Sequence, residues 1–94
     1  MKIKLAKTEN IHFIGIGGIG MSGLAIIMGS MGFKIQGSDI STGKNIDRLK
    51  RHKIKVLIGH KKIHVLGSTI IVISSAIKKN NPELLDAKKR KLPI

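Results

Sequence analysis

The chain has 94 residues, no cysteine and a formal net charge of +13. This length suits one small domain and is too short for a nucleotide-binding domain plus the catalytic domain that usually accompanies it. The lack of cysteine excludes disulfides and thiolate chemistry, and no apolar run is long enough to cross a membrane, so we expect a cytoplasmic protein without membrane contact.

The positive charge raises the question of nucleic-acid binding, since clustered Lys and Arg displace counterions from a phosphate backbone. Fifteen of the eighteen basic residues are Lys, however, and they are dispersed along the chain. Two Phe and no Tyr or Trp leave no platform for stacking bases. We therefore expect no nucleic-acid partner, and interpret the charge as a solvated lysine-rich surface that helps to steer an anionic ligand.

Residues 1–10 are polar and basic, and at most add part of an edge strand. The most informative stretch follows, at residues 11–23. Residues 11–16 are apolar apart from His12 and predict a central parallel strand buried on both faces. Gly15, Gly17 and Gly20 then fit the pattern G-x-G-x-x-G, which allows a tight turn and close approach of the backbone to an anion. Backbone N–H groups at the start of the next helix would hold a phosphate.

From Met21 the apolar residues recur at helical spacing. Leu24, Ile27, Met28 and Met31 are predicted to face a sheet, and Gly32 to end the helix. Two further glycines inside this helix, at positions 23 and 29, reduce its stability and indicate close packing.

A second short strand is expected over residues 33–36, closing in Gly37-Ser38-Asp39. Asp39 lies nineteen residues after Gly20, close to where dinucleotide-binding folds place the carboxylate that binds a ribose hydroxyl. The alternative is that this carboxylate caps the segment that follows. We favour the ligand role.

In the second half, Asn45 is predicted to cap a helix with Ile46 and Leu49 on its inner side. Residues 55–58 predict a third strand that ends at Gly59-His60. That position lies at the ligand-binding edge of open α/β sheets, so His60 is a better candidate than the histidines at positions 12, 52 and 64, and His12 suits a strand end. The four histidines share no metal-ligand spacing, and we expect no metal site.

Residues 63–66 predict a short turn or helix, and residues 69–73 an apolar strand that ends in Ser74-Ser75-Ala76-Ile77. The serine hydroxyls suit a diphosphate or sugar, or simply satisfy loose backbone groups. Asn81-Pro82-Glu83 predicts a helix start, with Asn as the cap and Glu near the positive end of the helix. Residues 92–94 read as the start of another strand, from which we expect a piece of a longer protein.

Together these motifs resemble the N-terminal domain of the Mur ligases from residue 12 to residue 94, in order and spacing. The form Gly-Ile-Gly-Gly-Ile-Gly-Met-Ser-Gly at residues 15–23 is more similar to the alanine-adding member of the family than to the murein-peptide recycling member. The other segments that carry the resemblance are Gly37-Ser38-Asp39, Gly59-His60, Ser74-Ser75-Ala76-Ile77 and Asn81-Pro82-Glu83.

The resemblance implies a function and a set of binding residues. In this family the first domain binds the UDP-sugar, here UDP-N-acetylmuramate, and the central domain binds ATP and Mg²⁺. An acyl-phosphate then forms on the muramyl carboxylate, and the amine of L-alanine attacks it. By implication the glycine loop lies against the diphosphate, Ser38 and Asp39 near the uridine, and His60 near the uracil. The remaining expected substrate-binding residues are Gly15, Gly17, Gly18, Ile19, Gly20 and Met21 in and around the loop, and Ser74, Ser75 and Ala76 beside the phosphates or sugar.

The expected fold is therefore a Rossmann-like, doubly wound α/β domain over residues 1–94, with four to five mostly parallel strands and about three helices. We expect no catalytic residue and no cofactor in it, because the G-x-x-x-x-G-K-[ST] phosphate loop is missing. ATP, Mg²⁺ and the reaction belong to the full-length enzyme with its central and C-terminal domains. The alternative is an NAD(P)-binding domain of an oxidoreductase or regulatory protein, which the glycine loop and Asp39 also fit.

Overall fold

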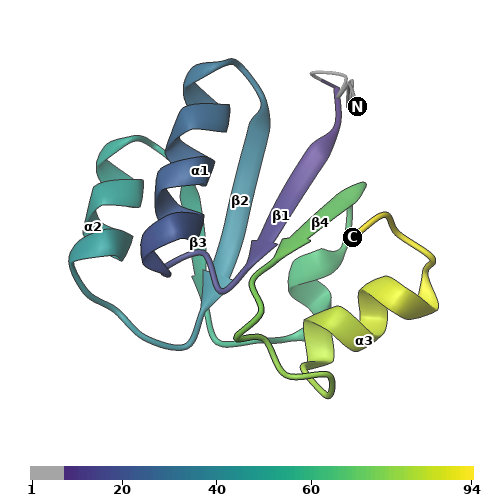
Figure 1. Ribbon diagram of the computed structural model, residues 1–94. Coiled ribbons are helices and arrows are strands. Elements are labelled where there is room, and N and C mark those ends of the chain that lie inside the picture. Colours follow the sequence, from purple (N-terminus) through teal and green to yellow (C-terminus); the bar gives the residue numbers. More distant parts are fainter. Residues whose placement is uncertain (1–7) are drawn as a thin grey trace.

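A computed structural model describes residues 8–94, which form an α/β domain with a four-stranded sheet (Figure 1). The suggestion of an edge strand within residues 1–10 falls mostly on residues 1–7, outside the described part. The elements, in chain order, are β1 (Asn10–Ile14), α1 (Ile19–Ser30), β2 (Lys34–Asp39), α2 (Lys44–Arg51), β3 (Lys55–Ile58), the 3₁₀ helix η1 (Lys62–Val65), β4 (Ile70–Ile73) and α3 (Pro82–Lys89).

The strand order is β3-β2-β1-β4, and every pairing is parallel. β1 lies between β2 and β4, with Ile11 opposite both Ile35 and Ile70. Its residues from Ile11 to Ile14 are buried, which confirms the strand predicted to be covered on both faces. Because the chain reaches β4 by crossing to the other side of β1, the sheet has a topological switch point between β1 and β4.

Helices cover both faces of the sheet. In Figure 1, α1 and α2 lie on one side, and α3 lies with η1 on the other. The side chains of β1 alternate accordingly. Phe13 packs in one core cluster with Ala25 of α1 and Leu49 of α2. Ile14 packs in a second cluster with Leu84 of α3. This confirms the doubly wound architecture.

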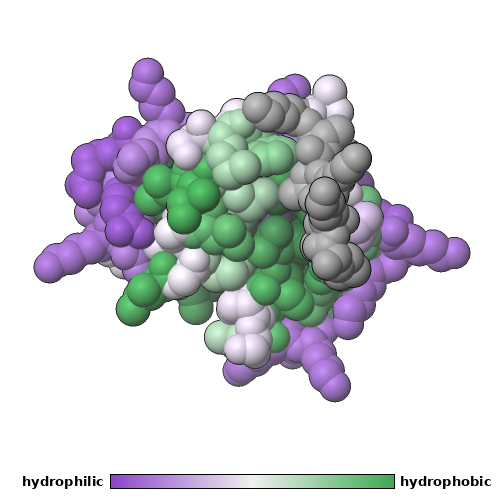
Figure 2. All heavy atoms as spheres, turned by 45° about the horizontal axis from the view of Figure 1, so that its top comes forward, coloured by the Kyte–Doolittle hydropathy of each residue, from purple (hydrophilic) through white to green (hydrophobic). Residues whose placement is uncertain are grey.

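The predicted inner face of α1 is correct for Met28, which packs against the core, and wrong for the other three residues. Leu24, Ile27 and Met31 are exposed, Ile27 to 58%, and the fully buried residues of the helix are Ser22 and Ala25. Apolar residues occur on all sides of α1, so their spacing does not identify the side that meets the sheet, and the two small residues make the close contact instead. Figure 2 shows hydrophobic side chains in a band across the face that it draws, with hydrophilic side chains on both sides.

The close packing expected at the glycines of α1 occurs elsewhere. A Cβ added at Gly23 would have no neighbouring atom within 4 Å, and one at Gly29 would make only an ordinary contact at 3.7 Å. In β2, by contrast, a Cβ at Gly37 would lie 2.5 Å from the Cβ of Ile16 and 2.8 Å from the carbonyl oxygen of Phe13. Gly37 therefore lets the segment after β1 cross directly over β2.

The chain returns to the sheet at its C-terminal end. Residues 92–94, expected to start another strand, have no assigned strand, but the carbonyl oxygen of Pro93 accepts a hydrogen bond of 2.8 Å from the N–H of Ile71 in β4. Gly32, with a φ of 96°, follows α1, and the side chain of Asn81 accepts hydrogen bonds from the N–H groups of Glu83 and Leu84 at the start of α3. Both of these helix boundaries agree with the sequence.

Candidate functional site

A cavity of about 690 Å³ opens at the carboxyl ends of the strands. Gly15 follows β1, Asp39 ends β2, His60 follows β3 and Ser74 follows β4, and all four line it. Parallel strands place their carboxyl ends at one edge, where α/β sheets bind ligands next to the switch point. The lining is completed by Gly18, Ile40, Ala76, Ile77, Lys78, Asn80, Asn81 and Pro82.

The glycine loop turns sharply away from β1. Gly15 has a φ of 81°, and its N–H and that of Ile16 both donate to the carbonyl oxygen of Ser38, at 2.8 and 3.0 Å. A Cβ at Gly15 would also lie 2.9 Å from the Cδ1 of Ile77. The left-handed backbone favours glycine here, and any larger residue would also have to displace the end of the Ile77 side chain.

The first turn of α1 has unused backbone donors. Ile19, Gly20 and Met21 have no carbonyl within the helix four residues before them, and Gly18 provides no side-chain cap. The first turn also has no acidic residue, and Gly18, Ile19 and Gly20 are exposed. These donors and the positive end of the helix dipole favour an anion at this point.

Asp39 holds the glycine loop in place. Its Oδ2 accepts a hydrogen bond of 2.8 Å from the N–H of Gly17, and its Oδ1 accepts from the N–H and Oγ of Ser41, both at 3.2 Å. The Nδ2 of Asn45 donates to the carbonyl oxygen of Gly17 at 2.9 Å. Asn45 is therefore not the helix cap that the sequence predicted: α2 begins at Lys44 with Gly43 as its N-cap, two residues earlier than predicted, which leaves the amide of Asn45 free to hold the loop.

Behind the cavity, the carboxylate of Glu83 is fully buried beneath β1 and β2. Its Oε1 accepts hydrogen bonds from the Nε2 of His12 at 2.5 Å and the Oγ of Ser38 at 2.6 Å. Its Oε2 accepts from the N–H of Lys61 at 3.0 Å and the Nδ1 of His64 at 2.9 Å. Burial by itself would raise the pKa of Glu83, but the hydrogen bonds from His12, Ser38 and His64 outweigh it and lower the pKa from 4.5 to about 2.

This cluster corrects the prediction for His12 and adds to the one for Glu83, which does lie in the first turn of α3. His12 is not a strand-end residue but lies fully buried in the middle of β1, and Glu83 is not merely a charge at the start of α3 but the acceptor at the centre of the cluster. The sequence signal was a polar residue in a strand that is otherwise apolar. The partner of His12 is 71 residues away along the chain, so no local pattern pairs them.

The structure brings part of the predicted set together at the cavity. Gly15, Gly18, Asp39, His60, Ser74 and Ala76 line it. The others do not: Gly17 and Ser38 lie behind it in the hydrogen-bond networks described above, Ser75 is exposed, and Ile19, Gly20 and Met21 form the first turn of α1. Sequence reasoning missed the exposed Lys78, a cation at the cavity wall, because it follows the last strand in an irregular segment.

The lowered pKa of Glu83 predicts acid sensitivity. Because the unfolded chain takes up this proton near pH 4.5 and the folded chain only near pH 2, the stabilisation is complete above pH 4.5 and is lost as the pH falls between these values. The loss attributable to Glu83 should be about 3 kcal/mol. Urea unfolding at a series of pH values between 4.5 and 2 measures this loss. Glu83→Gln is the control, because a glutamine side chain does not take up the proton. Equal pH slopes for the two proteins would contradict the prediction.

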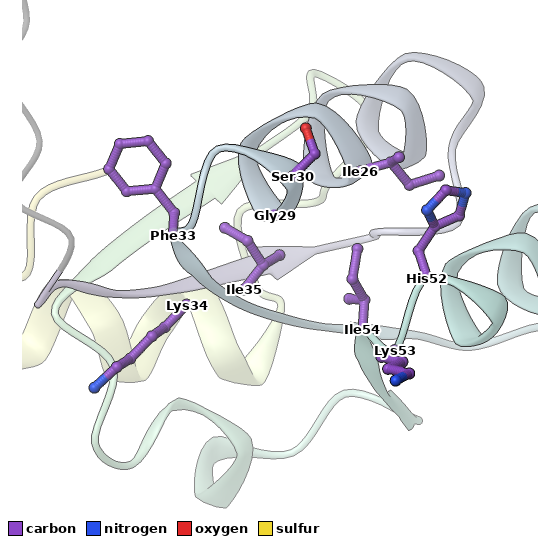
Figure 3. Close-up of a pocket in the computed structure, with 9 residues that line it drawn as sticks. All are labelled: Ile26, Gly29, Ser30, Phe33, Lys34, Ile35, His52, Lys53 and Ile54. Atoms are coloured by element: carbon purple, nitrogen blue, oxygen red, sulfur yellow. The ribbon is translucent and has the colours of Figure 1, made fainter.

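A second cavity, of about 390 Å³, lies at the opposite edge of the sheet between the end of α1 and the turn before β3 (Figure 3). Figure 3 shows Ile35 and Ile54 pointing toward α1, whereas Lys34 points away from the cavity. None of the predicted site residues lines it.

Across residues 8–94, no group of three or more His, Cys, Asp and Glu is arranged to hold a metal ion, and no helix is long and apolar enough to cross a membrane.

The fold and the cavity define a class: a Rossmann-like α/β domain with a glycine loop at its switch point. Residues 10–94 match the family described as "Mur ligase family, catalytic domain". The chain belongs to the Mur ligase family.

Individual relatives agree. The chain is 66% identical over 94 residues to a UDP-N-acetylmuramate–L-alanine ligase of Pelagibacter ubique, covering 100% of this chain and 20% of that protein. It is 48% identical over 96 residues to the ligase of the same name from Rickettsia bellii, covering 98% and 20%. The crystal structure of UDP-N-acetylmuramate-alanine ligase from Thermotoga maritima superposes with a TM-score of 0.86 at 32% identity, covering 90% of this chain and 20% of that chain. The chain thus spans about a fifth of the length of these relatives.

Proposed function

We propose that the chain is the UDP-N-acetylmuramate-binding domain of an ATP-dependent ligase that adds L-alanine to this sugar nucleotide in cytoplasmic peptidoglycan biosynthesis. The observation that carries the proposal is the free N–H groups of Ile19, Gly20 and Met21, which directly follow Gly18 at the wall of the cavity. A diphosphate there would accept these donors, and Lys78 would add a positive charge. We take the identity of the sugar nucleotide from the names of the relatives.

The geometry around Asp39 favours this ligand over a dinucleotide. A dinucleotide-binding domain needs the carboxylate after β2 to accept hydrogen bonds from a ribose diol. Here Oδ1 already accepts two bonds from Ser41 and Oδ2 one from Gly17, which leaves one free lone pair, on Oδ2, where a ribose diol needs an acceptor for each of its two hydroxyls. Asp39 therefore shapes the loop and borders the cavity.

The chain's own role is to bind and orient the substrate. ATP, Mg²⁺ and the acyl-phosphate chemistry belong, in this proposal, to the central and C-terminal domains of the full-length enzyme. We expect the chain alone to release no ADP in the presence of ATP, UDP-N-acetylmuramate and L-alanine. Alanine-dependent ADP release would contradict this division of roles.

Thermal unfolding with candidate ligands tests the binding. A ligand that binds only the native state raises the midpoint temperature of unfolding. At one hundred times its Kd it adds about 2.7 kcal/mol to the free energy of unfolding. UDP-N-acetylmuramate should raise it, UDP alone should raise it less, and NADH and a short oligonucleotide should leave it unchanged. Stabilisation by NADH at concentrations where the sugar nucleotide has no effect would overturn the proposal, and a salt-sensitive response to the oligonucleotide alone would favour nucleic-acid binding.

A further inference from the structure

Three imidazoles converge on the buried Glu83, and only one of them also lines the ligand cavity. That one is His60, whose Nδ1 lies 3.0 Å from the Oγ of Ser38 and 3.4 Å from the Oε2 of Glu83. The side chain of His60 is 14% exposed, whereas those of His12 and Glu83 are fully buried. The proton positions in the cluster therefore decide what His60 offers to a ligand.

The proton of His12 can be placed from Gln36. The Nε2 of Gln36 donates 2.9 Å bonds to both the backbone carbonyl oxygen of His64 and the Nδ1 of His12. A carbonyl oxygen only accepts, so the nitrogen of the amide must face it, and the Nδ1 of His12 must accept as well. The proton of His12 is then on Nε2 and is donated to Glu83.

The hydroxyl of Ser38 is placed by the same reasoning. Its Oγ lies 2.6 Å from the Oε1 of Glu83, a carboxylate that only accepts, so the hydroxyl proton is donated there. The Oγ then has only lone pairs for the Nδ1 of His60. Because the second neighbour of this Nδ1 is also an oxygen of Glu83, His60 must donate from Nδ1.

We infer that Glu83 is a positioning residue that, acting through Ser38, holds the proton of His60 on Nδ1 and leaves the Nε2 lone pair as a hydrogen-bond acceptor for a ligand in the cavity. A free neutral imidazole prefers the opposite arrangement, with its proton on Nε2. The cluster thus imposes the less common tautomer at the one histidine of the three that lines the cavity.

An acceptor at this place selects a ligand that carries a donor. This step rests on the proposed function: in a uridine nucleotide the imide N3–H of uracil is such a donor, whereas N3 of cytosine is an acceptor. A site built to pair with a donor discriminates strongly against a ligand that lacks it, because a polar group is then left unpaired. His60 should therefore favour uridine over cytidine nucleotides.

The tautomer is tested without ligand, by ¹⁵N NMR of the chain labelled at its histidine rings and measured above neutral pH. His60→Gln identifies the resonances, and His52→Gln, an exposed histidine outside the cluster, is the control. We expect a protonated Nδ1 and an unprotonated Nε2 at His60. Ser38→Ala removes the nearer of the two oxygens beside this Nδ1 and should raise the share of the Nε2–H form at His60, while His12 keeps its own tautomer. A protonated Nε2 at His60 in the unaltered chain would overturn the inference.

Binding of UMP, CMP and N3-methyl-UMP, followed by calorimetry, tests the selection. We expect UMP to bind at least tenfold more tightly than either analogue, and Ser38→Ala to reduce that ratio while folding is checked by circular dichroism. Equal affinities with the expected tautomer would overturn the selection by His60. Failure of UMP and UDP-N-acetylmuramate alike to bind, with the expected tautomer observed, would overturn the proposed function and leave the positioning by Glu83 intact.

Discussion

Replacing Glu83 by alanine should lower the free energy of unfolding by about 3–5 kcal/mol, the cost of removing one partner from a buried ionic cluster. The variant leaves four donors without their acceptor, the buried side chains of His12 and Ser38 and the partly buried side chain of His64 and N–H of Lys61. Small domains have only about 5–15 kcal/mol of stability, so this loss is a large share of it. Urea unfolding followed by circular dichroism measures the change.

The matched control for this variant is Asp47→Ala. Asp47 is an exposed carboxylate in the first turn of α2, where it interacts mainly with the helix dipole. Its removal should cost less than about 1 kcal/mol. Equal losses for the two variants would show that the cluster around Glu83 contributes no more than a surface charge.

Replacing Gly17 by alanine should weaken binding of UDP-N-acetylmuramate at least tenfold, or about 1.4 kcal/mol. The added Cβ would lie 2.7 Å from the Oδ2 of Asp39 and 2.9 Å from the Cδ1 of Ile46. Ile46 is part of the core beneath the loop and has little room to move. Asp39 must therefore shift, which breaks its bond to the N–H of Gly17 and displaces the loop that leads into α1.

Gly23→Ala, within α1 itself, is the control. A Cβ at Gly23 meets no atom within 4 Å, so the change should stabilise α1 by about 0.5–1 kcal/mol and leave the affinity unaltered. Calorimetric titration of both variants, with circular dichroism to confirm folding, distinguishes loop geometry from a general loss of stability. Wild-type affinity in Gly17→Ala would contradict the role assigned to the loop.

Much of the architecture could be predicted from local patterns. The third strand occurs at the predicted residues 55–58, and the helix after Asn81 begins as its cap and proline indicate. The parallel, doubly wound arrangement followed from alternating strands and helices. The buried face of α1 could not be predicted, because apolar residues surround that helix and the small Ser22 and Ala25 make the contact.

The candidate site, too, could be predicted only in part. Residues at strand ends, such as Asp39, His60 and Ser74, were placed near one another because parallel strands end at a common edge. The hydrogen-bond partners of each residue could not be predicted from the sequence. Asp39 was expected near the uridine of the ligand, whereas its hydrogen bonds to the glycine loop and to Ser41 depend on the path of the chain in three dimensions.

By itself the sequence determined the tight turn at Gly15, the Asn81 cap of α3 and the succession of strands, because these depend on the conformational preferences of a few adjacent residues. Only the tertiary structure decided that Glu83 would meet His12 and Ser38. These partners lie 71 and 45 residues from it along the chain, and a buried carboxylate is retained only where folding brings enough donors around it.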